Sequence, residues 1–252
     1  MSDNHQESFW TKYVFSQDHK WIGIQYGVTA LFFMLLGFIL MIVMRYQHVH
    51  AGTISPDTYN SFGAMHGTIM VFLGIVPVIV GAYGNYLVPL QIGAPDMAFP
   101  KLNMASYWCY FLGGVTMLYG FTLPGGAANS GWTSYPPLSN IATTGQTVWL
   151  LGMLFLIASS LLGSVNIIVT TVQLRVKGLT WMRLPFFVWA QLVTSFLLVL
   201  AFPPLQAAGI FQLMDRVVGT SFFMPSGLVV GGEMHAATGG GSPLLWQHLF
   251  WF

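Results

Sequence analysis

The sequence predicts an all-α fold, a polytopic bundle of transmembrane helices, from three observations. Its 252 residues are 55% hydrophobic and only 6% charged, whereas an average soluble domain has about 25% charged residues. No charged residue occurs between positions 102 and 174. Several apolar runs exceed the ~20 residues that a helix needs to cross the ~30 Å hydrocarbon core. A membrane β-barrel is excluded, since its strands would alternate apolar and polar residues over shorter runs.

Five runs are long enough to be complete spans, and a partial sixth begins near Pro243. The five cover residues 22–44, 59–90, 102–123, 148–174 and 184–214. Residues 1–20 are polar and lack the apolar region of a signal peptide, so the first span is expected to act as the insertion signal. No repeat or domain boundary is visible, and residues 1–252 are expected to form one bundle.

Lysine and arginine residues collect on one side of the predicted membrane, with six there against two, Arg45 and Arg216, on the other. Because such residues favour the cytoplasmic side, the N-terminus is expected in the cytoplasm. A net charge of +1 without a basic patch argues against a nucleic-acid partner. The lone Cys109 excludes disulfides and thiolate clusters within the chain. The six lysine and arginine residues on the expected cytoplasmic side are Lys12, Lys20, Lys101, Arg175, Lys177 and Arg183.

His66 is the one histidine deep inside a complete predicted span. An imidazole in hydrocarbon is costly, and its uses there are metal ligation, proton relay or packing against a polar partner. Its neighbours Gly63, Ala64, Gly67 and Thr68 are small, which would let a flat macrocycle approach the backbone. These residues favour a ligand at His66, with packing as the alternative.

A lone carboxylate, Asp96, follows the second span directly, and polar side chains accompany it on other spans. A carboxylate at this point can open a proton path into the bundle, or it can simply be a charge at the end of a helix. Small polar residues also join membrane helices, typically for ~0.6 kcal/mol each. The accompanying residues are Asn85, Asn103, Ser106, Ser159, Ser160, Ser164 and Asn166.

Arg45 closes the first span on the outer side. A snorkelling arginine is the simpler interpretation. The alternative is a cation that contacts the propionates or another polar substituent of a buried cofactor, with Tyr59 and Trp132 as further donors.

Five segments resemble subunit I of the haem–copper terminal oxidases, and they occur in the order of that family. The resemblance covers the chain from His19 onward, and the segment around APDMAFP is the most specific part. The segments are HKWIGIQY (19–26), AMHGTIMVF (64–72), GNYLVPLQIGAPDMAFPKLN (84–103), GWTSYPPL (131–138) and WQHLFWF (246–252).

The resemblance implies a respiratory oxidase that passes electrons through a low-spin haem to a haem–copper centre, where dioxygen is reduced to water with proton pumping. It implies that His66 is an axial ligand of the low-spin haem iron and that Arg45, Tyr59 and Trp132 lie near the periphery of that haem. It also implies that Asp96 opens a proton path. The residues implied for the rest of that path are Asn85, Asn103, Ser106, Ser159, Ser160, Asn166 and Tyr26.

The sequence departs from the family pattern where the copper-site histidines and the remaining haem ligands would follow HLFWF. His248 precedes that motif and is not assigned to copper. The sequence is therefore expected to be the N-terminal portion of an oxidase subunit I, truncated or half of a split subunit, with no oxygen-reducing site of its own. A longer Gly-rich loop around Glu233 and His235, and Met104 in place of an asparagine, are further departures without an assigned role.

The expected partners are the remainder of subunit I, which would hold the second haem and copper, and oxidase subunits II and III in a bacterial-type inner membrane. Cytochrome c is the expected electron donor. Quinol-oxidising relatives usually carry an extra N-terminal span and a His/Gln pair, where this chain has Thr58 and Ser61. Nitric oxide reductase relatives lack the APDM segment. The alternatives are a quinol-oxidising member of the same family and, as a different class of function, a non-catalytic membrane fragment or assembly module.

Overall fold

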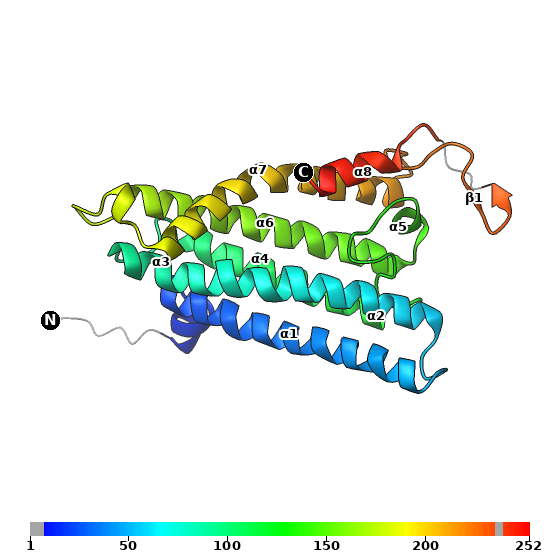
Figure 1. The fold of residues 1–252 in the computed structure, drawn as a ribbon, viewed down its shortest axis with the longest axis horizontal. Coiled ribbons are helices and arrows are strands. Elements are labelled where there is room, and N and C mark those ends of the chain that lie inside the picture. The colour runs from blue at the N-terminus through cyan, green and yellow to red at the C-terminus, as the bar shows by residue number, and fades with distance from the viewer. Residues whose placement is uncertain (1–7, 235–238) are drawn as a thin grey trace.

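The computed structural model describes residues 8–234 and 239–252 as a bundle of long helices lying side by side (Figure 1). Four helical runs in the described part are long and apolar enough to cross a membrane, which confirms the prediction of a helical membrane bundle. They are α1 (His19–Val49), the run Pro56–Ile92, α6 (Thr144–Gln173) and α7 (Phe186–Val217).

The predicted third span is also helical, but it is shorter than the other four. This helix, α4 (Pro100–Tyr119), has 20 residues and continues into a 3₁₀ turn, η4 (Gly120–Thr122). It packs along α6 (Figure 1). That α4 crosses a membrane stays a prediction, as does the cytoplasmic N-terminus.

The second membrane-length run is not one regular α-helix. It consists of α2 (Pro56–Thr68), two π-helical segments, η2 (Ile69–Ile75) and η3 (Pro77–Gly84), and α3 (Asn85–Ile92). Pro77 cannot donate a backbone hydrogen bond, which disturbs the α-helical ladder at the junction of η2 and η3. π-Helical segments inside long helices are frequent at functional sites. The span predicted over 59–90 is therefore one helical run, Pro56–Ile92, that changes its helix type along its length.

The helix α1 begins three residues earlier than predicted, because Asp18 provides an N-cap. Its carboxylate accepts a hydrogen bond from the backbone N–H of Lys20 at 2.8 Å. A capping side chain satisfies one of the free N–H groups of the first helical turn. His19 is therefore the first residue of α1 and is buried, although the sequence placed it ahead of the first span.

A short β-hairpin in the Gly-rich loop was missed by the all-helical prediction. Its strands are β1 (Val229–Val230) and β2 (Glu233–Met234), paired antiparallel with Val229 opposite Met234. The two turn residues, Gly231 and Gly232, have φ angles of 62° and 89°, as tight hairpin turns require. Glu233 is exposed on β2, and His235 lies outside the described residues.

Four short helical elements complete the described fold. The C-terminal helix begins at Pro243, where the partial sixth span was predicted, and covers eight residues. The short elements are η1 (Trp10–Val14), α5 (Leu138–Ile141), η5 (Trp181–Arg183) and α8 (Pro243–Phe250).

The helices α4 and α6 pack with their backbones in contact at two glycines. A Cβ atom added to Gly113 would lie 2.9 Å from the carbonyl oxygen of Gly152, and one added to Gly152 would lie equally close to that of Gly113. Phe33, Tyr110 and Trp149 fill the adjacent core and are at most 2% exposed. Small residues at such a crossing let membrane helices approach closely.

The end of α7 is fastened to the α5 region by Arg216. Its guanidinium donates five hydrogen bonds, four of them to backbone carbonyl groups, so that every N–H of the side chain has an acceptor. The acceptors are Thr147 Oγ1 (3.0 Å), Asn140 O (3.0 Å), Ala142 O (2.9 Å), Thr143 O (2.7 Å) and Ser139 O.

The neighbouring Asp215 fastens the start of the following loop. Its carboxylate accepts four hydrogen bonds, which come from side chains on both sides of it and from the loop backbone. The donors are Thr220 Oγ1 (2.6 Å), Phe222 N (2.8 Å), Phe223 N (2.9 Å) and Asn140 Nδ2 (2.9 Å). Asp215 and Arg216, which we call the α7 clamp, therefore have all their polar atoms engaged.

Candidate functional site

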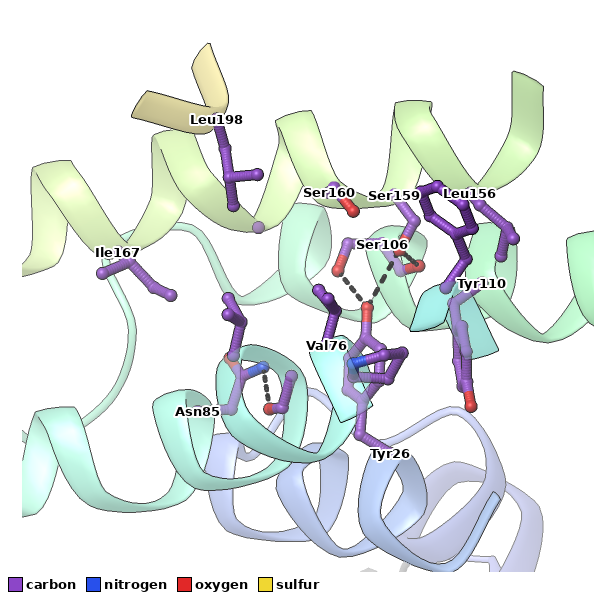
Figure 2. Close-up of a pocket in the computed structure, with 15 residues that line it drawn as sticks. Tyr26, Val76, Asn85, Ser106, Tyr110, Leu156, Ser159, Ser160, Ile167 and Leu198 are labelled. Carbon is purple, nitrogen blue, oxygen red and sulfur yellow. Dashed lines mark hydrogen bonds between the residues drawn. The ribbon is translucent and has the colours of Figure 1, made fainter. Parts of the chain in front are cut away.

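Three hydroxyl groups from three helices form a hydrogen-bonded chain in the middle of the bundle (Figure 2). Tyr26 on α1 lies 2.6 Å from Ser106 Oγ on α4 and 3.2 Å from Ser159 Oγ on α6. The hydroxyl of Ser159 donates a hydrogen bond to the carbonyl oxygen of Ser106 at 2.7 Å. Its oxygen then accepts from Tyr26, and the oxygen of Tyr26 accepts from Ser106. The chain of donors therefore has a direction, from Ser106 through Tyr26 to Ser159.

The close approach of α1 and η3 depends on a glycine beside Tyr26. A Cβ atom added to Gly81 would lie 2.6 Å from the ring of Tyr26. The absence of a side chain at Gly81 lets the tyrosine ring lie against η3 and directs its hydroxyl toward α4 and α6 (Figure 2). The position of the Tyr26 hydroxyl in the chain thus depends on the glycine at position 81.

A small cavity adjoins the hydroxyl chain. About 40 Å³ of it is open to the centres of water molecules, which is room for about three waters. Asn85 lies on its wall (Figure 2) and donates from Nδ2 to the carbonyl oxygen of Gly81 at 2.7 Å, while its Oδ1 has no partner among the described residues. The predicted path residues that line this cavity, which we call the cavity cluster, are Tyr26, Asn85, Ser106, Ser159 and Ser160.

Two further asparagines look alike in the sequence but differ in their surroundings. Asn103 on α4 is fully buried, and neither atom of its amide has a partner within the described part of the chain. Asn166 on α6 is equally buried, but its amide accepts from Phe99 N at 2.9 Å and donates to Phe99 O at 3.2 Å. Asn166 thus holds the backbone that leads into α4, whereas Asn103 is free to bind water.

Asp96 lies in the loop between α3 and α4 and is half-buried. Its carboxylate accepts a hydrogen bond from Met97 N at 2.6 Å. Thr170 on α6 holds the same loop by accepting from Ala98 N at 2.9 Å. No hydrogen bond between described residues joins Asp96 to the cavity cluster, and Asp96 does not line the cavity.

His66 on α2 is held by α1 through one ring nitrogen. Its Nδ1 lies 2.8 Å from the carbonyl oxygen of Gly37. A carbonyl can only accept, so Nδ1 carries the proton and Nε2 of the neutral ring carries a lone pair. Within the described residues, Nε2 has no hydrogen-bond partner. A hydrogen bond at one nitrogen that fixes the tautomer and leaves the other free is the usual arrangement of a metal-ligating histidine.

Of the three residues expected beside His66, Trp132 lies against Gly67, the residue that follows His66. A Cβ atom added to Gly67 would come within 2.9 Å of the indole ring. Tyr59, two turns before His66, instead shares a hydrogen bond of 3.1 Å with His48 Nε2. Arg45 is exposed at the end of α1, without a hydrogen bond to any described residue.

Two residues at the site were missed by the sequence reasoning. Tyr110 lines the cavity and donates from its hydroxyl to the carbonyl oxygen of Leu73 at 2.7 Å. His19 is 1% exposed, and its Nδ1 lies 2.8 Å from the carbonyl oxygen of Asn85. The available signal was the pair of prolines inside the second run, since each proline leaves a carbonyl group without its backbone donor.

The fold and the site define an integral membrane helical bundle with a half-buried imidazole, that of His66, and an internal chain of hydroxyl groups. Over the ranges 8–234 and 239–252, no group of three His, Cys, Asp or Glu side chains could hold a metal ion. The chain belongs to the family described as cytochrome c and quinol oxidase polypeptide I, whose family model matches residues 21–252.

Curated relatives support this family membership. The chain is 44% identical to an alternative cytochrome c oxidase subunit 1 of Bradyrhizobium diazoefficiens, over 98% of this chain and 43% of that protein. It is 46% identical to the cytochrome c oxidase subunit 1 of Thermostichus vulcanus, over 95% and 42%, and 41% identical to that of Synechocystis sp., over 100% and 44%. The chain thus spans about two fifths of the length of these relatives.

Proposed function

We propose that this chain is part of a respiratory terminal oxidase that takes electrons from cytochrome c, reduces dioxygen to water and moves protons across the membrane. The family membership and the relatives named cytochrome c oxidase subunit 1 support the reaction class. The donor rests on those names, since the family also contains quinol oxidases. The second haem, the copper and the contacts with subunits II and III are assigned to the rest of the complex.

The hydrogen bond from His66 Nδ1 to Gly37 O is the observation that carries the proposal, because it leaves Nε2 ready to ligate iron. A single imidazole is enough for one axial position of a haem, so the residues present fit this group. When bound, the haem supplies an iron that accepts and passes on one electron. Trp132, next to Gly67, together with Tyr59 and Arg45, would contact the periphery of the haem.

The proton path is assigned to Asp96 and the cavity cluster. Asp96 would take up the proton, and water would carry it past Asn103 to the cavity. Two features support this assignment. The amides of Asn85 and Asn103 have unpartnered polar atoms that can bind water, and the hydroxyls of Ser106, Tyr26 and Ser159 are hydrogen-bonded to one another beside the cavity. Asn166, whose amide is engaged by Phe99, would fix the entrance.

The haem assignment is tested by His66→Ala in the assembled complex that contains this chain. The variant should lose the absorption signal of the low-spin haem, because the iron loses its axial imidazole. His50→Ala, at an exposed position after α1, is the matched control and should keep the signal. An unchanged spectrum in the His66 variant would exclude this ligand.

The proton-entry assignment is tested by Asp96→Asn. Turnover and proton pumping should fall while haem content stays the same, since the change removes only a proton acceptor. Asp57→Asn, at an exposed carboxylate in the first turn of α2, serves as the control. Normal pumping in the Asp96 variant would reduce Asp96 to a charge at a helix end.

A further inference from the structure

Two prolines interrupt the second membrane-length run, and both are compensated from other helices. Pro77 and Pro89 lack the N–H that an α-helix would direct at the carbonyl groups of Leu73 and Asn85. The carbonyl oxygen of Leu73 accepts from the hydroxyl of Tyr110 on α4 at 2.7 Å. Asn85 O lies 2.8 Å from Nδ1 of His19 on α1. In each case a side chain from a neighbouring helix reaches the carbonyl group that the proline's N–H would have bonded in a regular α-helix.

His19 lies in a fixed position from which it can hold its hydrogen bond to the carbonyl oxygen of Asn85. It is the first residue of α1 and is 1% exposed. Since the carbonyl oxygen of Asn85 can only accept, Nδ1 of His19 is the donor. The turn that presents His19 is itself fixed by the cap that Asp18 makes with Lys20 N at 2.8 Å. The start of α1 therefore holds α3 at the one carbonyl that Pro89 leaves without a backbone donor.

Asn85 connects this bond to the cavity. Its main chain is held by His19 and its side-chain Nδ2 by the carbonyl oxygen of Gly81 at 2.7 Å. The remaining polar atom, Oδ1, is buried without a partner among the described residues, and the residue lines the cavity (Figure 2). Two fixed points leave the amide little freedom to turn, so the direction of Oδ1 depends on both.

We propose that His19 is a positioning residue of the proton path, which replaces the hydrogen bond that Pro89 removes and thereby holds the amide of Asn85 toward water in the cavity. This inference rests on the proposed proton path through the cavity cluster. His19 acts through Asn85 and does not itself carry the proton. This role is more specific than holding two helices together. The effect of His19 passes through the carbonyl group of Asn85, and it depends on Pro89, four residues after Asn85.

A set of variants in the assembled enzyme tests this mechanism by the rate of proton uptake. His19→Leu, which has no donor, should slow uptake by about fivefold, whereas His19→Asn, which keeps a short N–H donor, should stay within about twofold. Pro89→Ala restores a backbone donor to Asn85 O, so His19→Leu in that background should slow uptake by less than about twofold. Gln91→Leu, at an exposed position on α3, is the matched control and should change nothing.

Two results would overturn the inference. One is normal uptake in His19→Leu when Asp96→Asn is slow. The other is an equal loss from His19→Leu with proline or alanine at position 89, because the effect would then not pass through the carbonyl of Asn85. Haem spectra and circular dichroism of each variant establish that the complex is assembled.

The experiment also separates this inference from the proposed function. If Asp96→Asn takes up protons normally, the proton path is wrong, and the role of His19 in it is overturned as well. The hydrogen bond is then judged by the thermal midpoint of unfolding. His19→Leu should lower the midpoint clearly when Pro89 is present, and by less than about half as much in the Pro89→Ala background. Equal shifts would overturn the replacement of the proline's missing donor.

Discussion

The cavity cluster and the α7 clamp are both polar and largely buried, but they differ in whether their polar atoms have hydrogen-bond partners in the protein. In the clamp, Arg216 donates five hydrogen bonds and Asp215 accepts four. In the cavity cluster, the amide oxygen of Asn85 has no partner among the described residues, and the cavity of about 40 Å³ adjoins it. The clamp ties α7 to α5, which lies at the end of the bundle away from the start of α1 (Figure 1).

This difference in hydrogen bonding indicates two roles: the α7 clamp holds helices together, and the cavity cluster conducts protons. A polar group whose partners are all protein atoms is fixed in place and resists change. A buried polar atom without a protein partner costs stability unless water reaches it. The clamp should therefore respond to mutation through the free energy of unfolding. The cavity cluster should respond through the movement of water and protons.

The largest effect is expected when the clamp is broken by Arg216→Ala. Five acceptors lose their donor, so the free energy of unfolding should fall by about 3 kcal/mol. Arg216→Lys should lose most of the same stability, because one ammonium cannot reproduce the fork of the guanidinium. The free energy of unfolding of both variants is measured by titrating the chain with a denaturing detergent. Arg183→Ala, at an exposed position, is the control. A loss below about 1 kcal/mol would show that the clamp does not fasten α7.

The two buried asparagines provide a matched pair for the same comparison. Asn166→Leu removes the two hydrogen bonds to Phe99 and should cost about 2 kcal/mol of unfolding free energy. Asn103→Leu removes an amide without partners in the described part of the protein, so the change should stay within about 1 kcal/mol of zero. The same unfolding titration compares them. Equal costs for the two variants would contradict the assignment of one to fastening and the other to hydration.

A smaller effect, seen in transport alone, is expected when the cavity is filled by Gly163→Ala. Gly163 lines the cavity, and the nearest atom to an added Cβ would be Ser106 Oγ at 3.8 Å. The methyl group therefore fits and displaces water, so proton uptake should slow by about tenfold. The free energy of unfolding should not fall, since alanine is favoured over glycine in a helix by about 0.5–1 kcal/mol. Uptake at the wild-type rate would mean that the cavity carries no protons.

The smallest effect concerns the cap that holds His19 in its turn. Burial raises the pKa of the Asp18 carboxyl, but hydrogen bonds from Lys20 N–H and the Lys20 ammonium and the nearby positive charges outweigh it, so the pKa lies below the ordinary 3.8. The stabilisation is therefore present above that ordinary value and is lost as the pH falls through the lower, folded-state pKa.

Asp18→Asn tests this pH dependence. The amide keeps an acceptor at the cap but cannot titrate. The decline in thermal midpoint that the wild type undergoes in acid should therefore be smaller in the variant, and the two curves should converge at low pH. Parallel curves over the whole range would exclude a contribution from the Asp18 charge.

The sequence predicted most of the fold because membrane spans depend on the length of apolar runs. Residues such as Val28 and Leu31 on α1, which are 65% and 61% exposed, are apolar where lipid is expected. The π-helical segments and the burial of His19 were not predictable in this way. They depend on which side chain of another helix meets the carbonyl groups that Pro77 and Pro89 leave without a donor, and apolar run length contains no such information.

The candidate site was predicted as a list of residues but not as an arrangement. Tyr26 and Ser106 are assigned by the resemblance, and the structure joins them directly at 2.6 Å. Asn103 and Asn166 cannot be distinguished by residue type, because their difference lies in whether the backbone of Phe99 reaches the amide. The β-hairpin was missed because its Gly231–Gly232 turn lies in a stretch so rich in glycine that no single pair stands out.

The contact of Gly113 with Gly152 gives the centre of the bundle a particular mechanical property. At this crossing neither glycine carries a side chain, so the two backbones touch and the side chains of Met117 and Leu156 fill the space beside them. Ser106 and Ser159 each lie seven residues, about two turns, from these glycines on the same two helices. Hydrostatic pressure acts on empty volume, and here the separation of the two serines is set by incompressible backbone. The hydroxyl chain should therefore keep its length under pressure, while more loosely packed parts of the bundle contract around it.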